Sequence, residues 1–584
     1  MRRGKRFFTQ IQKAERPYEY WVEHCEEWRG EKEDRIAVKD FLKVYEMIRP
    51  EGTVGDPDCL QRFALQAEQG DYDLIYCDDD VVKNGVRTDP FFRPEYGPET
   101  YESYRYIPGL VAVKREILDE YGKDFAEHVR PERMLHIPEV LCHFVKERPA
   151  DGYAEESDEY ARESNDTVSI IILSKDHPEL LSRCVDSILS SDPPKGTEII
   201  TVDNGSSPEN RKLYRDLQRE NKIGYFHKPC EFNFSALCNL GAGMAKGQFL
   251  IFLNDDVQIP KVSKHFIQRL LAQAKKEHAG AVGMKLLYPE SRDIQHCGIC
   301  LQKSGPSHIL CGLPDEREYY FGFNRKTVNV TAVTGACLCI RKSLFDRVRG
   351  FDENLPLAYN DVDLCIRLMN RGFVNICING MYLYHYESAT RKKDTLDRAA
   401  YEKLKGYREY FAGRHREFIV KKDPFVNPNL TDTRADMSIN IEQDWEKSGV
   451  EIESGIPEGK IVYVKKGLLC HSDSSVYRIS DAYLNEDFFE ASGWIFFKRK
   501  KIAAYEPAIL VSSGEKKVLF DAVRTFRKDV EEVFRRKKDA CMSGFYTRVS
   551  RKILELEGFS GHMDVTPVLK DKKGRIYICG QRNG

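Results

Sequence analysis

Three continuous apolar runs, each followed by acids or amides, constrain the fold of this chain most strongly. They are Val168–Ser174 (VSIIILS), Glu198–Asp203 (EIITVD) and Gln248–Leu253 (QFLIFL). Apolar, β-branched runs of this kind are typical of strands that are covered on both faces. Apolar residues at helical spacing follow the first run, and a helix-like stretch at Phe234–Lys246 precedes the third. The pattern predicts an α/β fold with a mostly parallel sheet and right-handed crossovers.

The composition and hydrophobic pattern of the sequence change along its 584 residues and predict five segments. Short β-prone runs divided by turns predict a small all-β domain, a β-sandwich, at the C-terminal end. A polar stretch poor in large apolar residues predicts a linker between two α/β parts. The segments are a helical N-terminal extension at 1–70, a smaller α/β module at 71–148, the linker at 149–166, the main α/β domain at 167–435 and the sandwich at 455–584.

Charge and cysteine content exclude some classes of protein. The formal net charge of −2 argues against a broadly basic nucleic-acid binder. The 17 cysteines are odd in number and follow no regular framework, which favours reduced thiols in a cytoplasmic protein over a disulfide-built secreted one. No uninterrupted apolar stretch reaches the roughly 18 residues of a membrane span, so we expect at most peripheral membrane contact.

Polar residues at the ends of the three predicted strands are candidates for a site. They are Asp176, Asp203 and the adjacent Asn254, Asp255 and Asp256. Ligands of parallel α/β sheets bind beyond the carboxyl ends of the strands. Paired carboxylates there suit Mg²⁺ or Mn²⁺, which can bridge diphosphate oxygens and neutralise a leaving group. The competing interpretation of each acid alone is an ordinary turn after a strand.

A second polar cluster, Asn360, Asp361 and Asp363, begins a predicted helix. Such residues often only cap a helix and complement its dipole. The functional interpretation is that Asp361 is a general base, which takes the proton from an acceptor hydroxyl. A single displacement of this kind would invert the anomeric configuration. Further along, His385 ends another predicted strand.

The order of these motifs resembles the family 2 glycosyltransferases over roughly Val168 to Leu430. The motifs are VSIIILSKD, EIITVDNGS, FNFSALCNLGAGMAKG, FLIFLNDD, VTGAC, YNDVDLCIRL and YHYESATR. The resemblance implies a GT-A fold, which is a nucleotide-sugar-binding α/β domain. It is strongest to a subgroup that acts in bacterial rhamnan, O-antigen and other surface polysaccharide assembly.

The resemblance implies a role for each candidate residue. Asp361 would be the catalytic base, and Asp256 and His385 would bind Mg²⁺ or Mn²⁺. The nucleotide-binding residues would be Asp176, Asp203, Asn254 and Asp255. The residues of the donor and acceptor region would be Thr334, Gly335, Asn360 and Asp363. Asn360 stands where the family usually has Glu, which puts a supporting contact with the acceptor in question.

Substrates and location follow from the same resemblance. We expect a UDP- or dTDP-sugar as donor, a saccharide such as a lipid-linked one as acceptor, and no nucleic acid. The protein would then be cytoplasmic, with a place at the inner face of the cell membrane. The alternative is a non-catalytic glycan-binding scaffold built from degenerate transferase modules.

The first module also resembles part of this family. DLIYCDDD, GLVAVKREIL and HIPEVLCHF are similar to the back half of a GT-A unit, so we expect a truncated, inactive copy. The alternative is that Asp78–Asp80 and His143 form a second metal site. In the C-terminal segment, Trp494, Phe496 and Phe497 could either stack on sugar rings or form the core of the sandwich.

Overall fold

The structure is a computed structural model that describes Tyr18, Val22 and two long stretches of the chain. The stretches are residues 38–440 and 469–579, apart from gaps of which the longest are 149–165, 387–397 and 551–563. The contacts divide the chain into two compact units, Met1–Ile441 and Glu442–Gly584. Nearly all of the expected linker at 149–166 and the first part of the expected sandwich, up to residue 468, lie outside the described residues.

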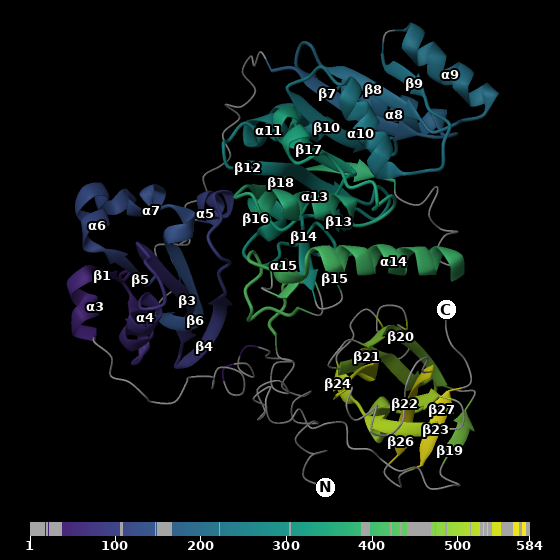
Figure 1. The fold of residues 1–584 in the computed structure, drawn as a ribbon. Coiled ribbons are helices and arrows are strands. Elements are labelled where there is room, and N and C mark those ends of the chain that lie inside the picture. The colour runs from purple at the N-terminus through teal and green to yellow at the C-terminus, as the bar shows by residue number, and fades with distance from the viewer. Residues whose placement is uncertain are drawn as a thin grey trace. The chain divides into compact units, whose positions relative to one another are not determined.

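The main domain is built on a mixed sheet, which has ten strands within the described residues (Figure 1). Its central order is β11-β18-β12-β17-β10-β7-β8-β9. Strands β10, β7, β8 and β9 run parallel, whereas β17 is antiparallel to both its neighbours. The strands are β7 (Val168–Ser174), β8 (Glu198–Asp203), β9 (Gly224–His227), β10 (Phe249–Asn254), β11 (Val257–Gln258), β12 (Ala279–Leu287), β13 (Ile294–His296), β16 (Thr327–Val330), β17 (Cys337–Arg341) and β18 (Val374–His385). The predicted α/β fold is confirmed.

Helices cover both faces of this sheet because side chains of successive strand residues point to opposite faces. In β7, Ile170 and Ile172 pack in a core with residues of α8, α9 and α11. Ile171, between them, packs in a different core with residues of α10, α12 and α13. The helices are α8 (Pro178–Leu189), α9 (Pro208–Arg219), α10 (Phe234–Met244), α11 (Phe266–Ala274), α12 (Lys342–Arg347) and α13 (Asn360–Met369).

The first module repeats one half of the main sheet. Its order β1-β5-β3-β6-β2, with β4 paired to β3, matches β10-β17-β12-β18-β11, with β13 paired to β12. The directions also match: β3 and β6 are parallel, as β12 and β18 are, and the other pairs are antiparallel. The strands are β1 (Tyr45–Ile48), β2 (Thr53–Gly55), β3 (Leu74–Lys83), β4 (Val86–Phe91), β5 (Val111–Lys114) and β6 (Met134–Phe144). Counterparts of β7, β8 and β9 are not found among the module's described residues.

The sheet of the first module begins earlier in the chain than the sequence indicated. Strands β1 and β2 lie within 1–70, beside α3 (Val38–Val44) and α4 (Cys59–Ala67), where we expected only a helical extension. Both strands are short and only partly buried, so they lack the continuous apolar run that identified the strands of the main domain.

The C-terminal unit contains two sheets that share a core. One sheet has the order β19-β27-β26-β22-β23 and the other β20-β21-β25-β24. Phe489 and Phe545 from the second sheet pack with Ile509 and Leu569 from the first, as in a β-sandwich. The strands are β19 (Leu469–Ser472), β20 (Ser475–Leu484), β21 (Phe488–Phe497), β22 (Tyr505–Ser513), β23 (Lys516–Asp521), β24 (Val523–Thr525), β25 (Gly544–Ser550), β26 (Asp564–Asp571) and β27 (Ile576–Cys579).

The aromatic run in β21 belongs to the interior of this unit. Phe497 lies in the core between the two sheets, and Trp494 and Phe496 pack with Phe534 in a second apolar cluster. Because all three rings of the run are buried, their faces are not offered to a glycan.

Candidate active site

The polar ends of the three buried strands meet at one edge of the main sheet. Ser174 at the end of β7 pairs in register with Asp203 at the end of β8. The Ser174 hydroxyl donates to Asp255 Oδ2 at 2.6 Å, just beyond the end of β10. The structure thus brings together the strand ends that the sequence predicted to form a site.

Asp203 organises the side of the site expected to face the nucleotide. The carboxylate is buried and accepts four hydrogen bonds: Oδ1 from the backbone N–H and the hydroxyl of Ser206, and Oδ2 from the Tyr225 hydroxyl and His227 Nδ1, at 2.5–3.0 Å. Burial opposes its ionisation, but these donors outweigh burial and lower the pKa of Asp203. These four hydrogen bonds use all the acceptor positions of the carboxylate. Asp203 therefore fixes the conformation of this loop by binding its neighbours.

Asp176 joins the same loop from the exposed side. Its backbone lies in the left-handed region, with φ of +57°, and its N–H donates to the Ser206 hydroxyl at 2.8 Å. Its Oδ1 accepts from the Ser207 N–H at 2.7 Å and from Asn210 Nδ2 at 3.0 Å. The Ser207 bond is the largest cause of the lowered pKa of Asp176. Asp176 therefore ties the end of β7 to the start of α9.

Asp256 and His385, predicted to share a cation, are neighbours in the structure. The turn Asp255–Asp256 joins β10 to β11, and β11 pairs with the end of β18, with Val257 opposite His385. His385 Nε2 lies 3.0 Å from Asp256 Oδ1 and 3.2 Å from Asn254 Nδ2. A residue that the sequence did not single out, Gln295, lies behind the imidazole, with its Oε1 2.6 Å from Nδ1.

This donor set fits a divalent cation. With Gln295 Oε1 accepting from Nδ1–H, Nε2 of His385 carries the lone pair and lies 3.0 Å from Asp256 Oδ1. Two adjacent ligands of an octahedral ion at about 2.1 Å stand about 3.0 Å apart, and these atoms are 3.0 Å apart. Within the described residues, no group of three or more His, Cys, Asp and Glu is arranged to hold a metal. Mg²⁺ commonly binds through one or two protein carboxylates plus substrate phosphates, which agrees with a site of few protein ligands.

Asp255 adds to the negative character of this edge. Burial raises the pKa of Asp255 to about 6, and the neighbouring charge of Asp256 contributes in the same direction. Ser174 donates to Asp255, and the Tyr214 hydroxyl lies 2.8 Å behind Ser174. Two crowded carboxylates in a partly buried turn favour the arrival of a cation.

Asp361 lies in the first turn of α13, beside the start of β17. Its Oδ2 accepts from the Gly335 N–H at 2.9 Å, and its Oδ1 accepts from the N–H of Val362 at the same distance. Thr334 precedes this glycine, and its hydroxyl accepts from the Ala336 N–H at 3.3 Å. The Ala336 carbonyl accepts from the N–H of Asn254, so the segment that holds Asp361 also contacts the end of β10.

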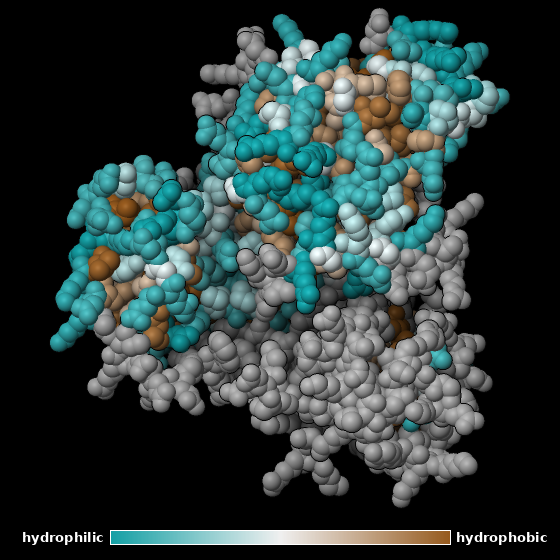
Figure 2. Space-filling view, viewed as in Figure 1, coloured by the Kyte–Doolittle hydropathy of each residue, from teal (hydrophilic) through white to brown (hydrophobic). Residues whose placement is uncertain are grey.

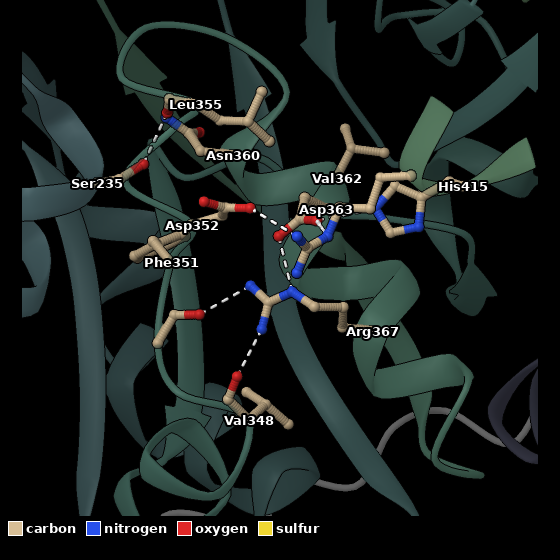
Figure 3. A network of polar contacts seen from close by, with 12 residues as sticks. Ser235, Val348, Phe351, Asp352, Leu355, Asn360, Val362, Asp363, Arg367 and His415 are labelled. Carbon is tan, nitrogen blue, oxygen red and sulfur yellow. Dashed lines mark hydrogen bonds and ion pairs between the residues drawn. The ribbon is translucent and has the colours of Figure 1, made fainter. Parts of the chain in front are cut away.

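The side chains of Asn360 and Asp363 form hydrogen bonds and ion pairs with other residues of the protein. Asn360 is buried, donates to the Leu355 carbonyl at 3.3 Å and accepts from the Asp361 N–H at 2.8 Å. Asp363 is fully buried, and Figure 3 shows it against Arg367 and His415. In the structure the carboxylate of Asp363 is directed to Arg367, Arg414 and His415, and its role in the donor and acceptor region stays a prediction.

The network around Asp363 connects α13 to a later helix. Asp363 Oδ2 accepts from Arg367 Nε at 2.7 Å, and Oδ1 lies 2.8 Å from His415 Nε2 and 3.0 Å from Arg414 Nε. Arg367 also donates to the carbonyls of Val348 and Gly350 (Figure 3). The i,i+4 spacing of Asp363 and Arg367 is a signal that the sequence offered. The contact with His415, between α14 (Arg398–Arg414) and α15 (Arg416–Val420), had no local signal.

Arginines of the first module neutralise two of its three adjacent acids. Asp79 is paired with Arg93 and Arg148, and Asp80 with Arg87. Asp78 accepts from the Arg93 N–H at 2.8 Å and from Asn427 Nδ2 at 2.9 Å. All three carboxylates are fully buried.

A second metal site is not supported by this arrangement. His143 pairs in register with Val54, as His385 pairs with Val257, so His143 takes the place of His385 in the repeat. Its Nδ1 lies 2.6 Å from Asp80 Oδ1. However, the turn between β1 and β2 is Arg49–Gly52, which has no aspartate, and a guanidinium already neutralises Asp80.

Comparisons with known proteins agree with this architecture. Residues 169–349 match the model of the family described as glycosyl transferase family 2. The chain is 30% identical over 448 residues to the O-antigen biosynthesis protein RfbC of Myxococcus xanthus, covering 66% of this chain and 34% of that protein. It is 30% identical over 179 residues to the N-acetylglucosaminyl-diphospho-decaprenol L-rhamnosyltransferase of Mycobacterium tuberculosis, covering 29% of this chain and 56% of that protein.

The chain spans between a third and a half of the two curated relatives that match it over the longest stretch. Among solved structures, it resembles TarS of S. aureus, with a TM-score of 0.30 and 12% identity over 71% of this chain and 78% of that one. It also resembles the mannosyltransferase PcManGT of Pyrobaculum calidifontis in complex with GDP-Man and Mn²⁺, with a TM-score of 0.30 and 13% identity over 40% of this chain and 60% of that one.

No helix in the described ranges combines the length and the apolar character needed to cross a bilayer. The family match covers β7 to α12, the part of the main domain that contains Asp203, Asp255 and Asp256. The topology of the sheet, the strand-end acids and the family match agree with one another. Residues 169–349 of the chain therefore form a glycosyltransferase family 2 domain, built on a mixed α/β sheet.

Proposed function

We propose that this protein transfers a sugar from a nucleotide diphosphate sugar to a saccharide acceptor, with inversion and with the help of Mg²⁺ or Mn²⁺. The observation that carries the proposal is the meeting of Asp256 and His385, whose facing atoms are 3.0 Å apart at the carboxyl edge of the sheet. When bound there, the cation supplies Lewis-acid neutralisation of the diphosphate as it departs.

Other residues of the chain position the nucleotide and activate the acceptor. Asp176 and Asp203 hold the loop at the ends of β7 and β8, where nucleotides bind in sheets of this kind. Asp361 takes the proton of the acceptor hydroxyl, and the Gly335 N–H orients its carboxylate. Because one base serves a single displacement at the anomeric carbon, the product has the inverted configuration.

The names of relatives support a place in surface polysaccharide synthesis. One relative is named for O-antigen biosynthesis, and another for rhamnosyl transfer to N-acetylglucosaminyl-diphospho-decaprenol. We propose the same class of acceptor here, a saccharide carried on a lipid diphosphate. The donor is then a UDP- or dTDP-sugar, and the protein works at a membrane surface.

The experiment is a screen of purified protein for hydrolysis of UDP-, dTDP- and GDP-sugars with Mn²⁺, followed by transfer to synthetic lipid-linked saccharides. Asp361→Asn should lower transfer at least a hundredfold and leave nucleotide binding intact, since general-base catalysis contributes roughly 10²–10⁴. The control is Asp346→Asn, which removes an exposed carboxylate of α12. Equal transfer by both variants, or no hydrolysis of any donor by the wild type, would favour the scaffold alternative instead.

A further inference from the structure

A half-buried aromatic side chain, Phe234, stands next to the proposed base. A Cβ built on Gly335 would lie 3.3 Å from Phe234 Cζ and 3.8 Å from Asp361 Cβ. The Phe234 ring and Cβ of Asp361 therefore both lie close to Gly335. Phe234 is the first residue of α10, and its side chain keeps part of its surface exposed.

The surroundings of Phe234 hold it firmly. Its N–H donates to the Pro356 carbonyl at 2.9 Å, and its ring packs edge to face with Phe351, with the ring centroids 5.9 Å apart. On either side of it, Asn233 caps the helix through the Ala236 N–H, and Ser235 donates to the Leu355 carbonyl at 2.7 Å. The loop before α13 and the start of α10 are thus one rigid wall beside Asp361.

This position has a consequence for the acceptor. A base must come within about 2.6–3.2 Å of the hydroxyl it deprotonates, so the acceptor sugar has to lie against Asp361. Aromatic faces suit the apolar C–H faces of sugar rings. Figure 2 shows that the visible surface of the main domain is largely hydrophilic, with hydrophobic patches set among the hydrophilic residues.

We infer that Phe234 is the stacking platform for the acceptor sugar whose hydroxyl is deprotonated by Asp361. The inference rests on the proposed function and adds to it a class of acceptor group: a pyranose that presents an apolar C–H face. Recognition of this sugar then comes from α10, whereas the donor is held at the ends of β7, β8 and β10.

The test compares Phe234→Leu with Phe234→Tyr. Leucine keeps apolar contact with Phe351 but has no flat face, whereas tyrosine keeps the face. The control is Phe226→Leu in β9, an aromatic side chain of the same domain that is 40% exposed. Stacking beyond simple burial contributes about 0.5–1.5 kcal/mol, which corresponds to a rise of roughly 2- to 13-fold in the acceptor KM.

We expect this rise in the acceptor KM for Phe234→Leu alone, with donor hydrolysis and the melting temperature close to wild type. An unchanged acceptor KM, or the same rise in Phe226→Leu, would contradict the stacking role of Phe234.

Saturation-transfer NMR with a rhamnose-containing oligosaccharide tests the stacking role of Phe234 without catalysis. A signal in the wild type and in Phe234→Tyr that is lost in Phe234→Leu supports it, and no signal in the wild type contradicts it. Absence of donor hydrolysis in the wild type would count against the proposed function alone.

Discussion

His415 Nε2 lies 2.8 Å from Asp363 Oδ1, and this contact joins the segment after α14 to the helix that begins beside Asp361. Tyr359, just before α13, stacks on Phe411 of α14 with the ring centroids 5.2 Å apart. Two residues of one segment, Phe411 and His415, therefore hold the first turn of α13. The orientation of the proposed base depends on a helix that lies beyond the family match in the chain.

His415→Ala should lower both stability and transfer. The substitution removes one of the donors to a buried carboxylate, which costs about 1–3 kcal/mol. Transfer should fall more than nucleotide binding, because only the base is displaced. His415→Gln, whose amide can donate to Asp363, should restore part of both. Thermal melting and transfer rates measure the two effects, with the exposed His128→Ala as control. A His415→Ala protein with wild-type transfer would show that α13 needs no such anchor.

Gly335→Ala should reduce transfer while leaving the fold intact. The added methyl group would lie 3.3 Å from Phe234 Cζ, so the ring or the base has to shift by a few tenths of an ångström. A misplacement of catalytic groups by about 1 Å costs up to a hundredfold in rate, so we expect a loss of about tenfold in kcat. Gly243→Ala in α10 is the matched control, because its methyl group meets no atom within 4 Å. Equal kcat values for the two variants would mean that this contact does not matter.

Glu99→Gln should weaken the contact between the first module and the main domain. The resulting loss of unfolding free energy should depend on pH. Glu99, in α5 (Pro98–Tyr104), is 1% exposed; its Oε1 lies 2.8 Å from His278 Nε2 and accepts from Lys276 Nζ at 3.0 Å. Burial alone would raise its pKa, but these two residues and Asn329 outweigh burial and lower the pKa of Glu99 to about 2.

The lowered pKa means that ionised Glu99 stabilises the fold. Its contribution is present above pH 4.5 and is lost as the pH falls from 4.5 toward 2, with a full value of about 3 kcal/mol. Urea unfolding of wild type and Glu99→Gln should differ by about this amount at pH 7 and by about half of it at pH 3. The exposed Glu116→Gln in the first module is the control. A difference that is independent of pH would contradict the ion-pair explanation.

The protein should bind one Mn²⁺ per chain in the presence of nucleotide. Asp78, Asp79 and Asp80 are buried against guanidinium or imidazole groups and have no need of a metal. Equilibrium dialysis with Mn²⁺ and UDP or dTDP measures the stoichiometry. Asp80→Ala should leave it unchanged and lower the melting temperature, because Arg87 then loses its buried partner. Two ions per chain would show that the first module has kept a site.

Local patterns were enough for the strands that carry the site. The predicted limits of β7 and β8 agree with the structure, because buried parallel strands leave continuous apolar runs. The predicted meeting of Asp256 and His385 is also found, since the resemblance placed both at the edge of one sheet.

Features that depend on long-range contacts could not be predicted from such patterns. Strands β1 and β2 are too short to leave a run, although they complete the sheet of the first module. The burial of Asp363 depends on His415, which lies 52 residues away. Likewise, the arginines that pair with Asp79 and Asp80 lie outside β3, so the strand alone left a second metal site open as the alternative.

The most direct test of the shared cation is calorimetric titration of UDP and of dTDP into the protein with Mn²⁺ and with EDTA. The account predicts nucleotide binding with Mn²⁺ that weakens at least tenfold in EDTA, because Asp256 and His385 would hold the cation that neutralises the diphosphate. Asp256→Asn and His385→Ala should each weaken Mn²⁺-dependent binding to a similar degree, whereas Asp346→Asn and His128→Ala should not. Nucleotide binding of equal affinity in EDTA and in Mn²⁺, unchanged by either site variant, would contradict it.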